Sequence, residues 1–278
     1  MLGRIAIHLS SDSACGRRID AGLQLAKHHN AAVVGVFPID MPGHYYDESI
    51  VPHDVRQIVR GRRSELQDSI RKQFLEKSEA QGVSAEWRAP QGAADEALAL
   101  HARYCDLLVM SKAEHTDTVA SIVPNLAEAV VMGAGRPVLM IPNAGPLPST
   151  IGERVLYCWD QRREAARAFT DAAVFMQNCK ELVVLEVDRD EEQFNAFDVR
   201  EHDFSKYCVS HGYPSPKHLV KQSEGIGVGN VILNTAADYG SDLIVMGAYG
   251  HSRMRQWVMG GASRTLLSSM TVPVLLAH

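Results

Sequence analysis

The chain has 278 residues, of which 46% are hydrophobic and 22% are charged, and its formal net charge is −5. This balance excludes a disordered or fibrous protein, and the length suits one large or two medium-sized domains. Basic residues are scattered along the sequence, which argues against nucleic acid as a main partner. We expect a cytoplasmic protein with no membrane partner, because the apolar run at the amino terminus is too short for a signal peptide and no apolar stretch is long enough to span a membrane.

The first predicted elements alternate between strands and helices. Strands are predicted at 4–7 and 33–37, a helix lies between them at 14–29, an amphipathic helix follows at 55–81, and further strands are predicted at 106–110 and 137–139. The helices have apolar residues every three or four positions, whereas the strands are continuous apolar runs. Such strands are typical of a parallel sheet that helices cover on both faces, so the sequence predicts an α/β fold.

The same order of elements returns in the second half of the chain. The matched pairs are 4–7 with 154–157 and 33–37 with 183–187 at an offset of 150 positions, and 106–110 with 242–246 and 137–139 with 273–275 at an offset of 136. Repetition of this kind predicts two tandem copies of one domain. The change of offset gives the first copy 14 additional residues, which we expect in the loop around 38–53.

A stretch rich in Pro, Gly and Ser at 143–150 separates the copies and has the composition of a linker. We therefore predict one domain at 1–142 and another at 151–278, each with a doubly wound parallel sheet. The last strand of each copy would leave one sheet edge unpaired. We expect these two edges to pair within the chain, and a further homodimer stays open.

A glycine-rich segment follows the strand of the second copy that ends at Met246. It contains Gly247, Gly250, Gly260 and Gly261, and then Ala262 and Ser263 precede a helical segment. Ligands of open parallel sheets bind at the carboxyl ends of strands, where glycines and a helix amino terminus present backbone N–H groups to an anion. The segment therefore predicts a phosphate site, to which His251, Arg253 and Ser263 would add positive charge and a hydroxyl. The alternative is that the glycines serve only tight turns and that the charged side chains lie in solvent.

The spacing of Gly247, Gly250 and Gly260 resembles the phosphate motif of the universal stress protein family. In that motif Ser or Thr follows the third glycine, whereas Gly261 stands there in this chain, so a hydroxyl is lost unless Ser263 supplies one. The resemblance covers essentially the whole chain, twice. It implies two Rossmann-like domains of the adenine-nucleotide-hydrolase type, with ATP, ADP or AMP as the ligand and Mg²⁺ beside a triphosphate.

Two further positions follow from the resemblance. Asp160 matches the family's acidic residue beside the nucleoside, and Val187 matches the residue whose backbone contacts the adenine edge. An aspartate before a helix also suits an N-cap, and both interpretations of Asp160 stay open.

The first copy lacks the phosphate motif. Ser111, Glu114 and Pro124 stand at the positions of the three motif glycines, and Ser10 stands at the position of Asp160. A carboxylate repels phosphate, and proline has no backbone N–H to donate. We therefore expect no nucleotide in the first copy, whose role would be structural.

Catalytic motifs are not recognised in the sequence, which lacks a GxSxG elbow, a Walker loop and HExxH. Histidines and acidic residues at 44–54 do not have the spacing of a zinc site. We therefore expect no catalytic residues and no metal site, and a non-catalytic nucleotide-binding protein of stress response or signalling. The alternatives are a slow ATP hydrolase and an interaction module without nucleotide.

Overall fold

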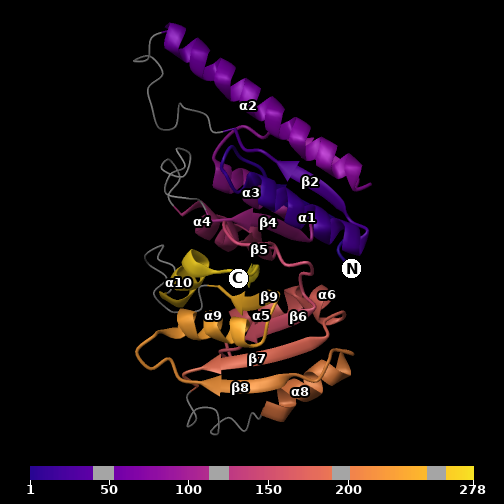
Figure 1. Cartoon of the computed structure of the whole chain (residues 1–278), viewed down its shortest axis with the longest axis vertical. Helices are drawn as coiled ribbons and strands as arrows, with labels where there is room; N and C mark the ends of the chain where they lie inside the picture. Colours follow the sequence, from indigo (N-terminus) through magenta and orange to yellow (C-terminus); the bar gives the residue numbers. More distant parts are fainter. Residues whose placement is uncertain (40–52, 113–124, 190–200, 249–260) are drawn as a thin grey trace. The chain divides into compact units, whose positions relative to one another are not determined.

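The computed structural model describes residues 1–39, 53–112, 125–189, 201–248 and 261–278, without the side chains of 53–60, 63, 201 and 261–264. It divides into two compact units, Met1–Arg136 and Pro137–His278. In the described residues no helix combines the length and the apolar character that crossing a membrane requires. Each unit alternates strands with helices (Figure 1).

Unit 1 contains one parallel sheet. Its elements are β1 (Arg4–His8), α1 (Cys15–His29), β2 (Ala32–Val36), α2 (His53–Ala80), β3 (Ala85–Arg88), α3 (Ala94–Ala102), β4 (Leu107–Ser111) and α4 (Leu126–Ala134). The strand order is β3-β2-β1-β4, so the chain winds outward from β1 and then returns to its other side. Successive residues of β1 point to opposite faces, and Ile5, Ala6 and Ile7 are all fully buried. Both faces of the sheet are therefore covered.

Unit 2 contains a larger sheet. Its elements are β5 (Val138–Ile141), β6 (Arg154–Cys158), α5 (Arg163–Asp171), α6 (Ala173–Met176), β7 (Glu181–Val187), α8 (Glu201–Ser210), β8 (Lys217–Lys221), α9 (Val228–Asp238), β9 (Leu243–Gly247), α10 (Gly261–Ser269) and β10 (Val274–Ala277). The order is β5-β10-β9-β6-β7-β8. All neighbours are parallel except β5, which pairs antiparallel with β10 through Leu139 opposite Leu275. The edge of β10 is thus occupied by β5.

The repeat is visible in the bounds of the strands. β6 begins and ends 150 positions after β1, and β9 begins and ends 136 positions after β4. The prediction of two doubly wound α/β copies is confirmed. The linker at 143–150 and the boundaries on either side of it stay predictions.

The additional length of the first copy lies in a helix. α2 has 28 residues, whereas α8, at the same place in unit 2, has 10. The prediction that the loop around 38–53 holds the extra residues is therefore wrong. Among the described side chains of α2, only Ile70, Phe74 and Ser78 are buried, at the spacing of one helix face. The helix therefore runs on past the residues that pack on the sheet.

The helix of the second copy that corresponds to the one predicted at 14–29 is divided in two. α5 ends at Asp171, and α6 begins at Ala173. Phe175 and Met176 are both buried, and Phe175 packs on Gly152, where an added Cβ would lie 2.5 Å from Phe175 Cδ1. A straight helix directs adjacent residues some 100° apart, so the break accompanies the burial of two adjacent side chains.

In each unit, an aspartate just before one strand accepts hydrogen bonds from backbone N–H groups at the amino end of the neighbouring strand. In unit 2 the Asp242 carboxylate accepts hydrogen bonds from the backbone N–H groups of Gly152, Glu153 and Arg154 at 2.9–3.1 Å and from the Thr150 hydroxyl at 2.7 Å. In unit 1, 136 positions earlier, one Asp106 oxygen accepts from the N–H groups that begin β1 at 2.7 and 2.9 Å. Both copies retain this charge-assisted clamp.

Replacement of Asp242 tests the clamp. We expect Asp242→Ala to lower the free energy of unfolding by about 2–4 kcal/mol, because three backbone donors lose a charged acceptor. Urea unfolding followed by fluorescence measures the loss. The matched control is Asp238→Ala, which removes an exposed ion pair with Lys221 and should change stability by less than about 0.5 kcal/mol. Equal losses in the two variants would contradict the assignment.

Candidate functional site

The carboxyl edge of the unit 2 sheet brings several predicted residues together. β6, β7 and β9 are parallel, so Cys158, Val187 and Gly247 end their strands at the same edge. The chain leaves β6 toward β7 on one side, whereas β9 and β10 lie on the other side. The winding therefore reverses between β6 and β9, and ligands of open α/β sheets bind at such a switch point.

Gly247 ends β9 at this switch point. A Cβ added to it would lie 2.5 Å from the backbone nitrogen of Ala165 and 2.5 Å from the carbonyl carbon of Glu164. The first turn of α5 therefore packs directly on the backbone of β9. Glycine is needed here for this close approach, and that requirement holds with or without a ligand.

Asp160 lies two residues beyond β6. Its Oδ1 accepts a hydrogen bond from the backbone N–H of Arg162 at 3.1 Å, and its side chain is 55% exposed. The residue at the N-cap of α5 is Arg162, which makes no side-chain capping bond. Asp160 therefore forms a turn ahead of the helix, with Gln161 at a φ of 62°, and its carboxylate faces solvent at the switch point.

Val187 ends β7 and is half-buried. The next residue, Asp188, has a φ of 54°, donates its N–H to the Lys221 carbonyl at 2.9 Å and accepts the Ser223 N–H on its own carboxylate at 2.7 Å. These bonds hold the chain where it leaves the sheet. The backbone of Val187 is thereby positioned at the edge.

A buried polar cluster beside these residues was missed from the sequence. Glu186 is 5% exposed, and its two carboxylate oxygens lie 3.4 Å from Gln161 Nε2 and 3.4 Å from Arg189 Nη1. Gln161 follows Asp160, and Glu186 precedes Val187, so the cluster links the two predicted nucleoside contacts. A glutamate that follows the apolar run Leu182–Leu185 near the end of the strand was the available signal.

A second carboxylate, that of Glu164, lies in the first turn of α5. A hydrogen bond from Arg163 Nε at 2.6 Å outweighs the effect of burial and holds the pKa of Glu164 below its ordinary value. Nearby, Ala248 donates its N–H to Ala277 at 2.8 Å, and His278 Nδ1 lies 3.1 Å from the Ala248 carbonyl oxygen. The Glu164 carboxylate is thus held in an ion pair with Arg163.

The other predicted ligand residues are only partly described. Gly250, His251, Arg253 and Gly260 lie outside the described residues, as do the histidines and acidic residues at 44–52. Gly261, Ala262 and Ser263 form the first turn of α10, without described side chains. Because β9 and β10 are parallel, α10 must run back along the sheet, with its amino end at the carboxyl edge.

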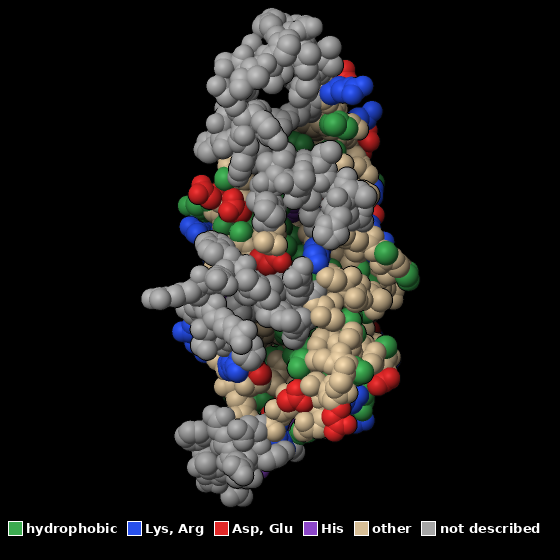
Figure 2. Space-filling model, turned by 90° about the vertical axis from the view of Figure 1, so that its left-hand side faces the viewer, with side chains coloured by type: hydrophobic (Ala, Val, Ile, Leu, Met, Phe, Trp, Pro, Cys, Tyr) green, Lys and Arg blue, Asp and Glu red, His purple; other side chains and the backbone are tan. Residues whose placement is uncertain are grey.

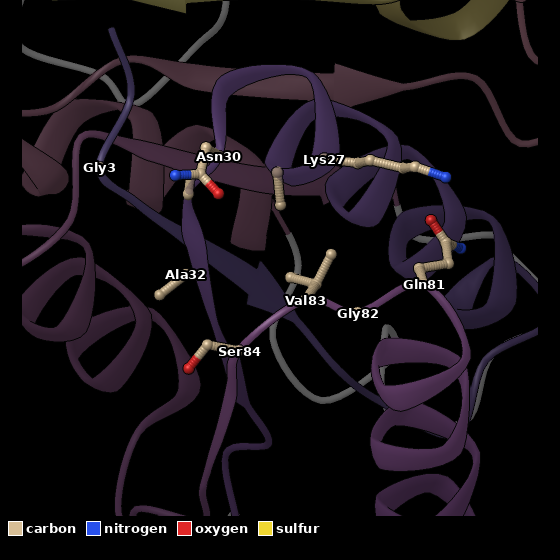
Figure 3. A pocket seen from close by; sticks show the side chains of 10 residues that line it. Gly3, Lys27, Asn30, Ala32, Gln81, Gly82, Val83 and Ser84 are labelled. Atoms are coloured by element: carbon tan, nitrogen blue, oxygen red, sulfur yellow. The ribbon is translucent and has the colours of Figure 1, made fainter.

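The cleft shown in Figure 3 lies elsewhere. It has a volume of about 390 Å³ and belongs to unit 1, at the amino ends of β1, β2 and β3 and the carboxyl ends of α1 and α2. Its labelled side chains include Lys27, Asn30, Gln81 and Ser84. None of the predicted ligand residues lines it. Figure 2 shows one face of the molecule, and acidic and basic side chains are interspersed over the described residues of the face shown there.

The equivalent edge of unit 1 is filled by charged and polar side chains. Arg18 of α1 is fully buried and bonds four groups. Its Nε donates to the His8 carbonyl at 2.7 Å, Nη1 to Asp12 Oδ1 at 2.9 Å and to the Ser111 hydroxyl at 2.6 Å, and Nη2 to the Ser10 hydroxyl at 2.7 Å. The arginine thereby ties the carboxyl ends of β1 and β4 together. From the sequence alone, an arginine in an amphipathic helix, here beside a second one at position 17, indicates a solvated residue.

Burial and charge shift the pKa of two members of this group. Burial alone would raise the pKa of Asp12, but the Arg18 charge and hydrogen bonds from Arg18 and Ser10 hold it below its ordinary value. Burial and the Arg18 charge lower the pKa of His8 to about 3 against the opposing charge of Asp12. In the described part of the chain, buried His8 Nδ1 has no hydrogen-bond partner. The folded protein therefore keeps this imidazole neutral.

The His8 shift predicts acid sensitivity. Between pH 6.5 and about 3, the unfolded chain binds a proton at His8 that the folded chain does not, so stability falls as the pH falls. The slope from this one group is about 1.4 kcal/mol per pH unit. We expect His8→Leu, which has similar volume and no titration, to flatten the dependence of the unfolding free energy on pH between 6.5 and 4. An unchanged slope would refute this origin of the acid sensitivity.

Substitution of Gly247 tests the close packing at the switch point. We expect Gly247→Ala to cost roughly 1–3 kcal/mol of unfolding free energy, because the new methyl group meets backbone atoms that cannot turn aside. Chemical denaturation measures it. Gly61→Ala in α2 is the control, since no atom lies within 4 Å of the added Cβ, and alanine should stabilise that helix by up to about 1 kcal/mol. A tolerated Gly247→Ala would show that α5 does not press on β9.

Known proteins match the chain in sequence and in fold. Residues 209–278 match the model of the universal stress protein family, and among curated proteins none matches the sequence. The chain shares 16% identity and a TM-score of 0.75 with a universal stress protein from Archaeoglobus fulgidus, over 99% of this chain and 95% of that one. It shares 13% identity and a TM-score of 0.61 with a putative universal stress protein from Pseudomonas aeruginosa, over 99% and 93%.

A protein of another kind has a related fold. The cytoplasmic domain of a prokaryotic cation chloride cotransporter matches with a TM-score of 0.51 and 14% identity, over 99% of this chain and 95% of that domain. The fold alone thus does not specify one function. The sequence match and the structural likeness together identify the chain as one with the universal stress protein fold over its whole length and the sequence of that family over residues 209–278.

Proposed function

We propose that unit 2 binds an adenine nucleotide at its carboxyl edge and acts without catalysis of its own in stress response or signalling. The observation that carries the proposal is the meeting of Asp160, Val187 and Gly247 at one switch point. Residues from three separate strands supply the groups that a nucleotide needs, and the amino end of α10 faces the same edge.

Each part of a nucleotide finds a chemically suited group. Backbone N–H groups at the start of α10 suit the phosphates, because a helix amino terminus carries unpaired donors and partial positive charge. The exposed Asp160 carboxylate suits a hydroxyl or amine of the nucleoside, and the backbone of Val187 suits the edge of the base. His251, Arg253 and Ser263 would complete the phosphate site.

Negative charge at the edge favours a metal-bound form of the ligand. Asp160 is exposed there and repels a free triphosphate, whereas the Glu164 carboxylate is paired with Arg163 at 2.6 Å. We therefore propose ATP with Mg²⁺, or the less charged ADP or AMP, as the ligand.

Unit 1 serves as a structural partner in this proposal. At its corresponding edge Arg18 and the residues it binds lie at the carboxyl ends of β1 and β4, and the motif glycines are absent. The linker at 143–150, the pairing of the copies, a cytoplasmic location and a homodimer are further proposals from the sequence.

An interaction module that binds no nucleotide is the second candidate. Gly261 favours it, because this residue supplies no hydroxyl where the family motif has Ser or Thr. In that case a partner protein would bind the surface of unit 2 while no nucleotide is bound there.

Titration of the full chain with ATP and Mg²⁺ tests the proposal. We expect a dissociation constant below about 1 mM, which corresponds to a binding free energy of about −4 kcal/mol. Asp160→Ala should weaken binding roughly tenfold through loss of one charged hydrogen bond. Glu153→Ala should leave it unchanged, since Glu153 precedes β6 at the opposite edge of the sheet and pairs with Lys180.

The outcomes separate the candidate functions. Absence of measurable binding up to millimolar ATP would remove the nucleotide and leave the interaction module. Phosphate release that disappears in Gly250→Glu would favour the slow hydrolase, whereas release that persists in this variant would come from a contaminant.

A further inference from the structure

The edge of unit 1 that corresponds to the candidate site holds a carboxylate in an anion-binding arrangement. Asp12 Oδ1 accepts from the backbone N–H of Ala14 and from Arg18 Nη1, each at 2.9 Å, and its Oδ2 accepts from the Ser10 hydroxyl. A guanidinium, a hydroxyl and a backbone N–H just before a helix are the donors with which proteins bind carboxylates and phosphates. Here the bound anion is part of the chain.

The arrangement is enclosed in the protein. The Arg18 side chain is 1% exposed and that of Asp12 is 9% exposed, so water cannot solvate the guanidinium. A buried charge without a partner is strongly unfavourable. The carboxylate of Asp12 is therefore the counter-ion that permits Arg18 to be buried at the carboxyl ends of β1 and β4.

Unit 2 has neither the buried arginine of α1 nor the serine of β4 at the equivalent positions, and Asp160 and Arg162, which stand at the positions of Ser10 and Asp12, are 55% and 40% exposed. Ala168 stands 150 positions after Arg18, and Gly247 stands 136 positions after Ser111. Ala168 is fully buried, and Gly247 is closely packed by α5. Unit 1 thus has an arginine and a serine where unit 2 has an alanine and a glycine. The positive and negative charges at the edge of unit 1 both come from its own side chains.

We propose that unit 1 contains a self-occupied anion site, in which Asp12 is the tethered ligand of Arg18, Ser10 and the Ala14 amide. This contact closes the edge of unit 1 to external ligands. The site would take a small oxyanion, of the carboxylate or phosphate type, when the Asp12 carboxylate is absent. The proposal is independent of nucleotide binding in unit 2.

Chemical rescue tests the site. We expect Asp12→Ala in the full chain to lower the Tm by roughly 5–15 °C, because Arg18 loses its counter-ion. Sodium formate should then raise the Tm of this variant by several degrees with saturation, as binding to the folded state requires. Wild type in formate, and the variant in sodium chloride of equal ionic strength, should show no such saturable rise. Inorganic phosphate distinguishes a site open to larger oxyanions from one that admits only formate.

The double variant Asp12→Ala, Arg18→Leu is the matched control. It removes both charges, so it should recover part of the lost Tm and should not respond to formate. If Asp12→Ala does not fold in chloride, the measurement becomes the yield of folded protein on refolding, which formate should raise above chloride in the single variant alone. Equal responses to formate and chloride, or equal formate responses in the single and double variants, would overturn the proposal.

Discussion

The parallel pairing of β1 with β4 and of β6 with β9 is the constraint on which the other features depend. It places the carboxyl ends of two central strands side by side and sends the chain away from them in opposite directions. Backbone groups and loops gather at that edge, and the helix that follows the first strand begins there. Each unit must fill this space, and the two units fill it with different chemistry. Burial of the strands themselves is alike in both, because their continuous apolar runs face helices on both sides.

Unit 1 fills the edge with a buried charge pair, whereas unit 2 fills it by close backbone packing. A buried ion pair contributes little more to stability than apolar residues of similar size would. Removal of one partner is costly, however, so the pair favours this one arrangement of side chains over others. In unit 2 the backbone of α5 packs directly on Gly247, and the buried charged pair at this edge, Glu186 with Arg189, lies at the end of β7. The two copies therefore have similar strands but differ in where buried charge lies at this edge.

The positions of the strands could be predicted from the sequence, whereas the structure of the segments that connect them was predicted less well. β4 and β9 align without a gap and differ by a similar apolar residue and by Ser111 against Gly247, because buried parallel strands require apolar runs in both copies. From the sequence, the additional residues of the first copy were placed in a loop and not in α2. Polar residues outside a buried helix face are equally compatible with a solvated helix and with a loop. The break between α5 and α6 depends on Phe175 reaching Gly152, a tertiary contact without a local signal.

The candidate site shows the same limit. Asp160, Val187 and Gly247 were found because the motif and the strand ends mark them, yet Glu186, Gln161 and Arg189 were missed, since a polar cluster is defined by which strands are neighbours. Arg18 is the clearest case. Its sequence context is that of an exposed helical residue, and only the pairing of β1 with β4 brings Ser10, Asp12 and Ser111 around it. Charged groups acquire their roles from topology, so a duplicated fold can keep its central strands and still hold a buried carboxylate–guanidinium pair at this edge in one copy and a closely packed glycine in the other.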